Sequence, residues 1–368
     1  MSSKLSAASA GAPATSWVAS LSPWPEEFGL DRMHDLLAGL GHPERRYPAI
    51  HVVGTNGKST ATRTIAALIR AEGRRAGAYT SPHVSGWAER IWVDGAESDF
   101  EQAVARVRPV AEEVDATQFE TLTAAALLEF AERDVDVAVL EAGLGGRLDA
   151  TNVVGAEVVL LTNVSLDHTE VLGETRDQIA NEKLAVAHAA RVVVLPDNEY
   201  VGLATRVAPK SVEIVTGGPG EAAERFLGRP IAHLELRADL PGRLEWRGRE
   251  LWDGAHNQAG TTWLRSRIGR PVDVVVASIL ADHYTEGMIA DLSAIAPRLI
   301  ATQSSNARAL PAAELAQRAA PRFGTVEVEP DPRHALARAR ATADGVVLVT
   351  GSMYLLAELV AAEEHEVR

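Results

Sequence analysis

The chain contains no cysteine among its 368 residues, and lysine is almost as scarce. The absence of cysteine excludes disulfides, thiolate metal sites and a cysteine nucleophile, and it fits a reducing compartment, so we expect a cytoplasmic protein. Lysine occurs only at Lys4, Lys58, Lys183 and Lys210, while arginine supplies the other basic residues. Because only an amine can lose its proton and react covalently at ordinary pH, each lysine is a candidate for chemistry that arginine cannot perform.

Long apolar runs and an excess of positive charge are also missing. No run approaches the ~20 residues that cross a bilayer, so we expect no membrane partner. The formal net charge of −14 argues against a nucleic-acid-binding surface. The small, polar residues 1–15 lack the apolar segment of a signal peptide and predict a loose tail.

Short β-branched runs alternate with helical stretches along the chain. Val137–Leu140 is continuously apolar, as in strands buried on both faces, and Ala49–Val53 and Val158–Thr162 are apolar except for His51 and Thr162. The alternation predicts the α/β class, with mostly parallel sheets covered by helices. Glycine and proline make Gly217–Leu240 look irregular, and a second series of strands follows. We therefore predict two domains, residues 1–246 and 247–368, with the boundary near Arg243–Arg249.

The most informative segment follows the run Ala49–Val53 and opens a helical stretch. A strand that leads through a Gly/Asn-rich turn into a helix forms a phosphate cradle, because turn amides and the helix N-terminus favour an anion. A lysine adds a point charge and a hydroxyl can reach Mg²⁺. The residues of this loop are Gly54, Thr55, Asn56, Gly57, Lys58, Ser59 and Thr60.

Polar residues also follow the other predicted strands. Taken singly, each of these residues has an ordinary structural interpretation, such as a turn serine, a surface lysine or a helix cap. Parallel strands, however, bring their carboxyl ends to one edge of a sheet, and open α/β folds bind ligands at that edge. Together they predict a site suited to Mg-ATP phosphoryl transfer. The residues concerned are Ser81, Glu141, Asp167, His168 and Asp253, with Lys183 on a following helix.

These motifs resemble the folylpolyglutamate synthase/dihydrofolate synthase family of the Mur ligase superfamily. The resemblance extends from Gly29 to Tyr354, and the segment LEAGLGGRLDATN at Leu140–Asn152 is close to diagnostic. Further matching motifs are Gly54–Lys58, Tyr79–His83, Phe119–Thr123, Thr162–His168, Glu182-Lys183, Pro241–Glu245 and Asp253–Asn257. The resemblance implies a P-loop-type central domain with a mostly parallel sheet and a smaller Rossmann-like C-terminal domain that presents glutamate.

The resemblance also implies residue roles. Lys58, Glu141, His168 and Lys183 would be catalytic, and the phosphate loop would bind ATP together with Arg243, Asp253 and His256. Ser81 and Glu141 would hold one Mg²⁺, and Glu141, His168 and a carbamylated Lys183 a second. The pterin site would be lined by Thr117, Gln118, Phe119, Glu120, Leu148, Asp149 and Ala150.

The implied reaction is ATP-dependent amide formation. ATP would phosphorylate the carboxylate of dihydropteroate or a folate, and the amine of L-glutamate would attack the acyl phosphate. The small-molecule substrates imply no macromolecular partner, and monomers are usual in the family.

The chain departs from the family pattern in three places. Lys58 is followed directly by Ser59-Thr60, where the family usually has an extra glycine after the loop lysine. The segment Arg225–Arg243 is too short for the family's Asn-Ala helix near adenine, and Ala281-Asp282-His283-Tyr284 replaces Ala-Asp-Lys-Asp. Three alternatives therefore stay open: a Mur-type ligase with another acceptor, a catalytically weak nucleotide-binding paralogue, and a P-loop kinase or GTPase. The set Glu141, His168 and Lys183 has no role in the last.

Overall fold

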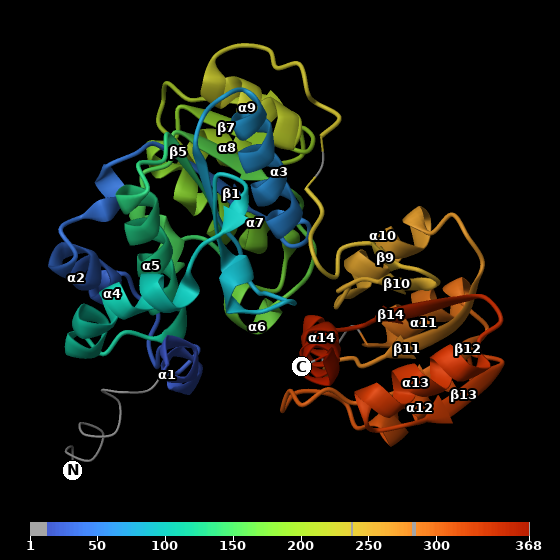
Figure 1. The fold of residues 1–368 in the computed structure, drawn as a ribbon. Coiled ribbons are helices and arrows are strands. Elements are labelled where there is room, and N and C mark those ends of the chain that lie inside the picture. Colours follow the sequence, from blue (N-terminus) through green and yellow to red (C-terminus); the bar gives the residue numbers. More distant parts are fainter. Residues whose placement is uncertain (1–12, 237, 282–284, 368) are drawn as a thin grey trace. The chain divides into compact units, whose positions relative to one another are not determined.

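The computed structural model describes residues 13–236, 238–281 and 285–367, and it divides into two compact units (Figure 1). Unit 1 comprises residues up to Ser81 and Trp87–Ala238, whereas Pro82–Gly86 and the residues from Asp239 onward form unit 2. The departure at residues 282–284 lies outside the described residues. None of the described helices combines the length and apolarity needed to cross a bilayer.

Unit 1 is built on an eight-stranded sheet that is parallel except at one edge. In spatial order its strands are β4 (Ala96–Glu97), β3 (Ile91–Val93), β2 (Ala76–Tyr79), β5 (Val137–Glu141), β1 (Ala49–Val53), β6 (Val158–Leu161), β7 (Val192–Leu195) and β8 (Glu213–Thr216). The pairs β2–β3 and β3–β4 are antiparallel. Asp94 and Gly95 both have positive φ in the turn between β3 and β4, as tight hairpin turns require.

Helices cover both faces of this sheet. They are α1 (Ala14–Ser20), α2 (Asp31–Gly39), α3 (Lys58–Ala71), α4 (Phe100–Glu113), α5 (Gln118–Glu132), α6 (Thr169–Leu172), α7 (Arg176–Leu184), α8 (Val201–Val207) and α9 (Pro219–Leu227). Short 3₁₀ turns are η1 (Pro43–Arg45), η2 (Trp87–Arg90), η3 (Ala150–Val153) and η4 (Ala185–Ala189).

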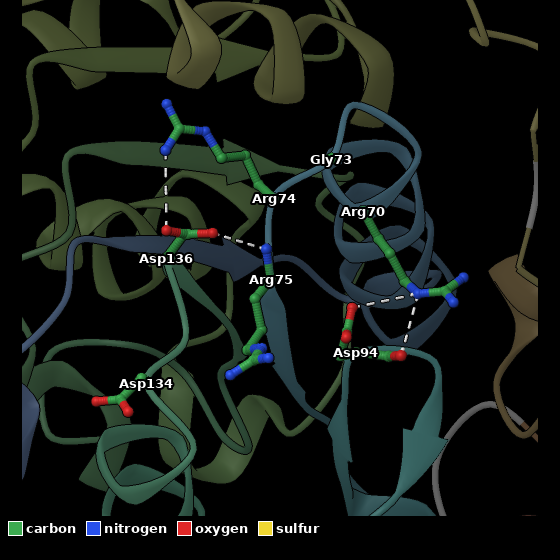
Figure 2. Close-up of a pocket in the computed structure, with 7 residues that line it drawn as sticks. All are labelled: Arg70, Gly73, Arg74, Arg75, Asp94, Asp134 and Asp136. Atoms are coloured by element: carbon green, nitrogen blue, oxygen red, sulfur yellow. Dashed lines mark hydrogen bonds and ion pairs between the residues drawn. The ribbon is translucent and has the colours of Figure 1, made fainter.

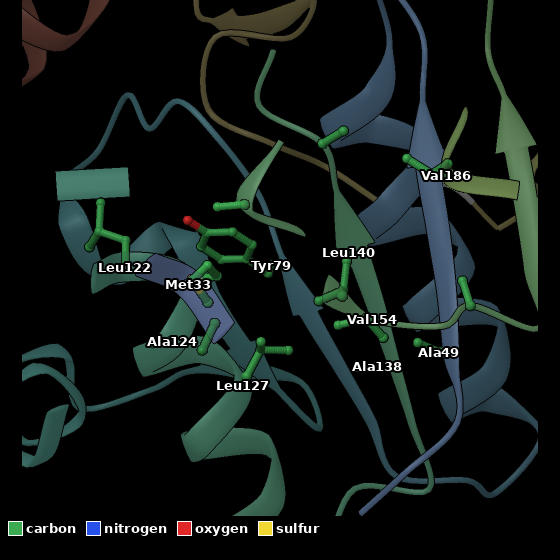
Figure 3. Close-up of a cluster of buried hydrophobic side chains, with 14 of the residues drawn as sticks. Met33, Ala49, Tyr79, Leu122, Ala124, Leu127, Ala138, Leu140, Val154 and Val186 are labelled. Atoms are coloured by element: carbon green, nitrogen blue, oxygen red, sulfur yellow. The ribbon is translucent and has the colours of Figure 1, made fainter. Parts of the chain in front are cut away.

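The alternation of side chains along β1 assigns one core to each face. Ile50 and Val52 point into a core with α3 and α9. Ala49 and Val53 point to the opposite face, where α2, α5 and the loop after β5 pack; Figure 3 shows part of this cluster. Because both faces are buried, β1 is fully apolar apart from His51.

Unit 2 contains a second, six-stranded sheet. Its spatial order is β13 (Thr325–Val328), β12 (Arg298–Ala301), β11 (Val272–Ala277), β14 (Val346–Thr350), β10 (Glu250–Trp252) and β9 (Glu245–Arg247), with only β9–β10 antiparallel. Its helices are α10 (Gln258–Arg267), α11 (Thr285–Ile295), α12 (Ala312–Ala319), α13 (Pro332–Thr342) and α14 (Met353–Val367). The expected α/β class with mostly parallel sheets is confirmed.

Two expectations about local structure need correction. The predicted loose tail already becomes helical at Ala14, where α1 begins. The segment expected to be irregular contains α9, because Pro219 lies at a first-turn position and Gly228 supplies the left-handed C-terminal residue. The domain boundary near Arg243–Arg249 stays a prediction; in the structure the longer segment of unit 2 starts at Asp239, and residue 246 lies within β9.

Candidate functional site

The carboxyl edge of the unit 1 sheet gathers the residues that follow four neighbouring strands. The order β2–β5–β1–β6 is parallel throughout, and Val52 pairs in register with Glu141. The phosphate loop after β1 is therefore flanked by Glu141 at the end of β5 and by the Thr162–His168 segment after β6.

The loop conformation depends on two glycines. Gly54 has φ of +148°, and a Cβ there would lie 1.9 Å from Thr162 Oγ1. Gly57 has φ of +79° and directly precedes α3. Both positions therefore disfavour a side chain, and the chain turns sharply from β1 into the N-terminus of α3.

The Thr162–His168 segment, which the sequence analysis identified only as a motif, holds the phosphate loop in place through hydrogen bonds. Asn163 accepts hydrogen bonds from Thr55 N and Asn56 N, both at 3.0 Å, through its backbone oxygen and Oδ1 respectively. Asn163 Nδ2 and Thr162 Oγ1 each donate to Asn56 O at 2.8 Å. Because these two loop amides are engaged, the amides of the first turn of α3, which lack acceptors within the helix, are the ones suited to an anion.

Two of the scarce lysines lie against the phosphate loop. Lys58 Nζ donates to Thr55 O at 3.1 Å, and the buried Lys183 Nζ donates to Gly54 O at 2.8 Å. Burial, reinforced by the positive charge of Lys58, lowers the pKa of Lys183 to about 7. Lys183 can therefore supply a neutral amine near neutral pH.

Glu141 is buried and connects two other predicted residues. Its Oε1 accepts a hydrogen bond from Ser59 Oγ at 3.0 Å, and its Oε2 accepts one from Ser81 N at 2.9 Å. Hydroxyl and carboxylate oxygens are the ligands that Mg²⁺ prefers, so this donor set fits the predicted metal.

A buried arginine that the sequence did not single out lies close to this carboxylate. Arg90 is buried at the end of η2, and burial lowers its pKa while the neighbouring Tyr79 and Glu141 oppose that shift. The sequence did not indicate that Arg90 is buried near the site, because an arginine just before a strand is ordinarily exposed.

His168 occupies a more open position than the other predicted ligands. It has φ of +50° at the start of α6, and its ring nitrogens lie 3.9 Å from Asp167 and 3.8 Å from Glu170. Across residues 13–236, 238–281 and 285–367, no three His, Asp or Glu side chains are grouped as a metal site. The arrangement of two Mg²⁺ ions stays a prediction.

The predicted pterin residues at the start of α5 have structural partners. Thr117 and Glu120 form a reciprocal capping box, and Glu120 also pairs with Arg32 at 2.8 Å. Gln118 Nε2 donates to Val18 O at 2.9 Å. The capping box explains why α5 begins at Gln118.

The second predicted pterin segment meets the first at Phe119. A Cβ on Gly143 would lie 2.5 Å from Phe119 Cζ, so the loop after β5 passes directly over this ring. Within that loop Leu148 is half-buried, whereas Asp149 and Ala150 are buried. The fold thus brings the two sets together at one place in unit 1.

The predicted nucleotide residues of unit 2 also lie together. Asp253 is buried and accepts hydrogen bonds from Leu244 N and Ala255 N, both at 2.9 Å. Burial raises the pKa of Asp253, and the charges of Arg243 and His256 oppose the rise. Leu244 has φ of +48°, an uncommon conformation for a residue other than glycine and one that often marks functional turns.

The short segment before Arg243 adds no helix. Between α9 and β9 the described residues form turns and bends only. The expected departure at the adenine end of the nucleotide therefore has a structural counterpart.

A surface depression lies at the amino edge of the unit 1 sheet, where α3 ends and β2 begins (Figure 2). Arg70 pairs with Asp94 at 3.3 Å and Arg74 with Asp136 at 3.8 Å, and Arg75 N donates to Asp136 at 2.7 Å. None of its lining residues belongs to the predicted site. Its ion pairs are exposed and secure the turn rather than form a ligand site.

The fold and phosphate loop of unit 1 are those of a Mur ligase: the family model for the Mur ligase middle domain matches residues 52–235, half of the chain. A dihydrofolate synthase/folylpolyglutamate synthase of Mycobacterium tuberculosis is 32% identical in an alignment that covers 82% of this chain and 80% of that protein. The chain belongs to the dihydrofolate synthase/folylpolyglutamate synthase family.

Solved structures of this family match the fold over nearly the whole chain. E. coli FolC in complex with DHPP and ADP gives a TM-score of 0.86 at 26% identity and covers 97% of this chain and 99% of its own. The bifunctional folylpolyglutamate synthase/dihydrofolate synthase of Yersinia pestis complexed with AMPPNP and Mn ion gives 0.84 at 26% identity, covering 96% and 98%.

Proposed function

We propose that this protein is an ATP-dependent ligase that joins L-glutamate to the carboxylate of dihydropteroate, of a folate, or of both, and releases ADP and inorganic phosphate. The observation that carries the proposal is the convergence at one sheet edge of a phosphate loop, the Ser59–Glu141 pair and the buried amine of Lys183. A kinase or GTPase has no use for such an amine.

The reaction is proposed in two steps. An oxygen of the acceptor carboxylate attacks the γ-phosphorus of ATP and ADP departs, which makes a poor electrophile reactive. The glutamate nitrogen then attacks the acyl carbon, the phosphate leaves with the C–O electron pair, and the amine loses a proton. The amides of α3 and the Lys58 ammonium supply positive charge where negative charge accumulates.

Magnesium fits the residues present. Ser59, Ser81 and Glu141 would hold one ion, and Glu141, His168 and Lys183 would hold a second if the amine of Lys183 is carbamylated. Such ions neutralise phosphate charge when bound. The pKa of about 7 at Lys183 favours the uncharged amine that reaction with CO₂ needs.

The loops of unit 2 that carry Arg243, Asp253 and His256 are proposed to contact the nucleotide, and unit 2 to present glutamate. We also propose that the protein acts in the cytoplasm as a monomer. Holding acceptor and amine together would remove much of the entropic barrier to amide formation.

The decisive experiment measures ADP release from Mg-ATP and L-glutamate, with dihydropteroate, with tetrahydrofolate, and without acceptor. Acceptor-dependent ADP release with formation of the glutamyl amide supports the proposal and identifies the acceptor. ATP binding without acceptor-dependent turnover would instead favour the catalytically weak paralogue.

A further inference from the structure

His51 is a polar residue in the middle of an otherwise apolar, fully buried strand. Its side chain lies on the face of β1 that also carries Ala49 and Val53, and its Nε2 is 2.8 Å from Thr151 Oγ1 in the loop after β5. Its Nδ1 is buried and has no hydrogen-bond partner in the part of the chain that the structure describes. A valine would avoid this desolvation penalty, so the position calls for an explanation.

The hydrogen bonds around Thr151 run in one direction. The Asp149 carboxylate accepts from Leu144 N at 2.8 Å, from Thr151 N at 3.0 Å and from the Thr151 hydroxyl. Because these groups are all donors, Asp149 acts as an acceptor and the Thr151 hydroxyl donates to it. The hydroxyl oxygen is then left to accept a hydrogen bond from His51 Nε2–H.

This direction requires a proton on Nε2 of His51. Burial lowers the pKa of His51 to about 3, so the ring is uncharged across the range in which enzymes are assayed. The lone pair on Nδ1 is then the unpartnered group, which agrees with the absence of a nearby donor.

The hydrogen bonds from His51 to Thr151 and from Thr151 to Asp149 join two parts of the candidate site. β1 ends in the phosphate loop, and Asp149 closes the Leu144–Thr151 loop on itself beside the Phe119 ring. His51 therefore connects the strand that carries the phosphate loop to the loop expected to bind the acceptor. Residues 51 and 151 are 100 positions apart in sequence, so this link exists only in the folded protein.

We propose that His51 is a positioning residue, which acts through Thr151 and Asp149 to hold the acceptor-binding loop in register with the phosphate loop. The inference rests on the proposed function, because it assigns the Leu144–Thr151 loop to the acceptor. It also gives Asp149, a predicted pterin residue, the role of holding its own loop, because its carboxylate accepts three hydrogen bonds there.

The test compares His51→Leu, which removes the donor at similar volume, with His51→Gln, whose amide can place an N–H near the Nε2 position. Full-length variants are assayed with whichever acceptor the wild-type protein uses. We expect His51→Leu to raise the acceptor KM about tenfold, the effect of one lost hydrogen bond, while the ATP KM changes less than about twofold. His51→Gln should restore most of the acceptor affinity.

Thr151→Val removes the same link from the other side and keeps the side-chain volume. It should reproduce the rise in acceptor KM, and the double variant His51→Leu/Thr151→Val should be no worse than either single variant, because both remove one connection. Ile50→Val, on the opposite face of β1, is the matched control and should leave both KM values unchanged.

The outcomes separate this inference from the proposed function. Absence of acceptor-dependent turnover in the wild-type protein would refute the function. With an active wild-type protein, an unchanged acceptor KM in Thr151→Val, additive effects in the double variant, or equal rises in both KM values would overturn the role of His51. Thr151→Val decides the question if His51→Leu does not fold.

Discussion

Ser59 Oγ donates a hydrogen bond of 3.0 Å to Glu141 and thereby joins the first turn of α3 to the carboxyl end of β5. The two residues are separated by 82 positions in the sequence. These two side chains offer hydroxyl and carboxylate oxygens beside a helix N-terminus, so they are among the groups that would hold the proposed Mg²⁺.

Glu141→Gln should lower turnover by at least about 100-fold, a typical loss when one electrostatic element of an active site is removed. The amide keeps the size of the side chain but lacks the charge that the proposed metal site needs. Steady-state ADP release measures the effect. Glu129→Gln, a buried carboxylate in α5 that pairs with Arg133 at 3.4 Å, should lower the melting temperature but not turnover. Turnover of Glu141→Gln within about threefold of wild type would contradict the assignment.

Lys183→Arg should abolish turnover and leave the fold intact, because a guanidinium cannot be carbamylated. Product formation and circular dichroism provide the two measurements. The conservative replacement Lys210→Arg, on a residue outside the site, should retain full activity. Activity near the wild-type level in Lys183→Arg would refute the proposed carbamate.

The stability of the metal-free protein should depend on pH through Lys183. The pKa of Lys183 is about 7 in the folded state, against an ordinary value of ~10.4 in the unfolded chain. Between these values the unfolded chain binds more protons, so the free energy of unfolding rises with pH by up to ~1.4 kcal/mol per unit. Below pH 7 the folded protein carries the full cost of a buried, protonated Lys183, so its free energy of unfolding is lowest there. Lys183→Met should lack this contribution.

Urea unfolding of the wild-type protein and of Lys183→Met from pH 6 to 9 tests this expectation. The variant should be the more stable of the two at pH 6, and its advantage should shrink as the pH rises. Parallel stability curves would show that the amine is not desolvated as described.

Gly54→Ala should weaken nucleotide binding and destabilise the protein by more than about 2 kcal/mol. The new Cβ would collide with Thr162 Oγ1, and φ of +148° is unfavourable for alanine. Nucleotide titration and denaturant unfolding measure the two effects. Gly155→Ala, where the Cβ would make an ordinary contact at 3.5 Å with Ala189, should change stability by less than about 1 kcal/mol. Equal behaviour of the two variants would argue against the loop geometry.

Arg32→Met should destabilise the protein by about 1–3 kcal/mol, because the buried Glu120 carboxylate loses its charged partner. The same carboxylate caps α5 through Thr117, so the start of α5 should also exchange its amide hydrogens faster. Arg45→Met provides the comparison: the Arg45 side chain is 70% exposed beside Glu44, and its loss should cost less than about 0.5 kcal/mol. Similar losses from both variants would show that burial of Glu120 is not decisive.

Local patterns predicted the central strands well and the edges poorly. Val137–Leu140 and Val346–Val349 are continuous apolar runs because helices cover both sides, and such runs are visible in a sequence. The edge strands β8 and β13 are partly exposed, and two of the four residues in each are polar, so their apolar signal is weak. α9 was missed because Pro219 and Gly228, which delimit the helix, were interpreted as signs of irregular chain.

By itself the sequence determined the strand–helix alternation, the phosphate loop and the set of polar residues that follow the strands, because these depend on local preference and spacing. Only the tertiary structure decided which of them meet. The contacts Ser59–Glu141, His51–Thr151 and Lys183–Gly54 join residues 82, 100 and 129 positions apart. Such contacts arise from strand order and burial, and burial in turn lowers the pKa values of Lys183 and His51, so the chemistry of these side chains belongs to the fold.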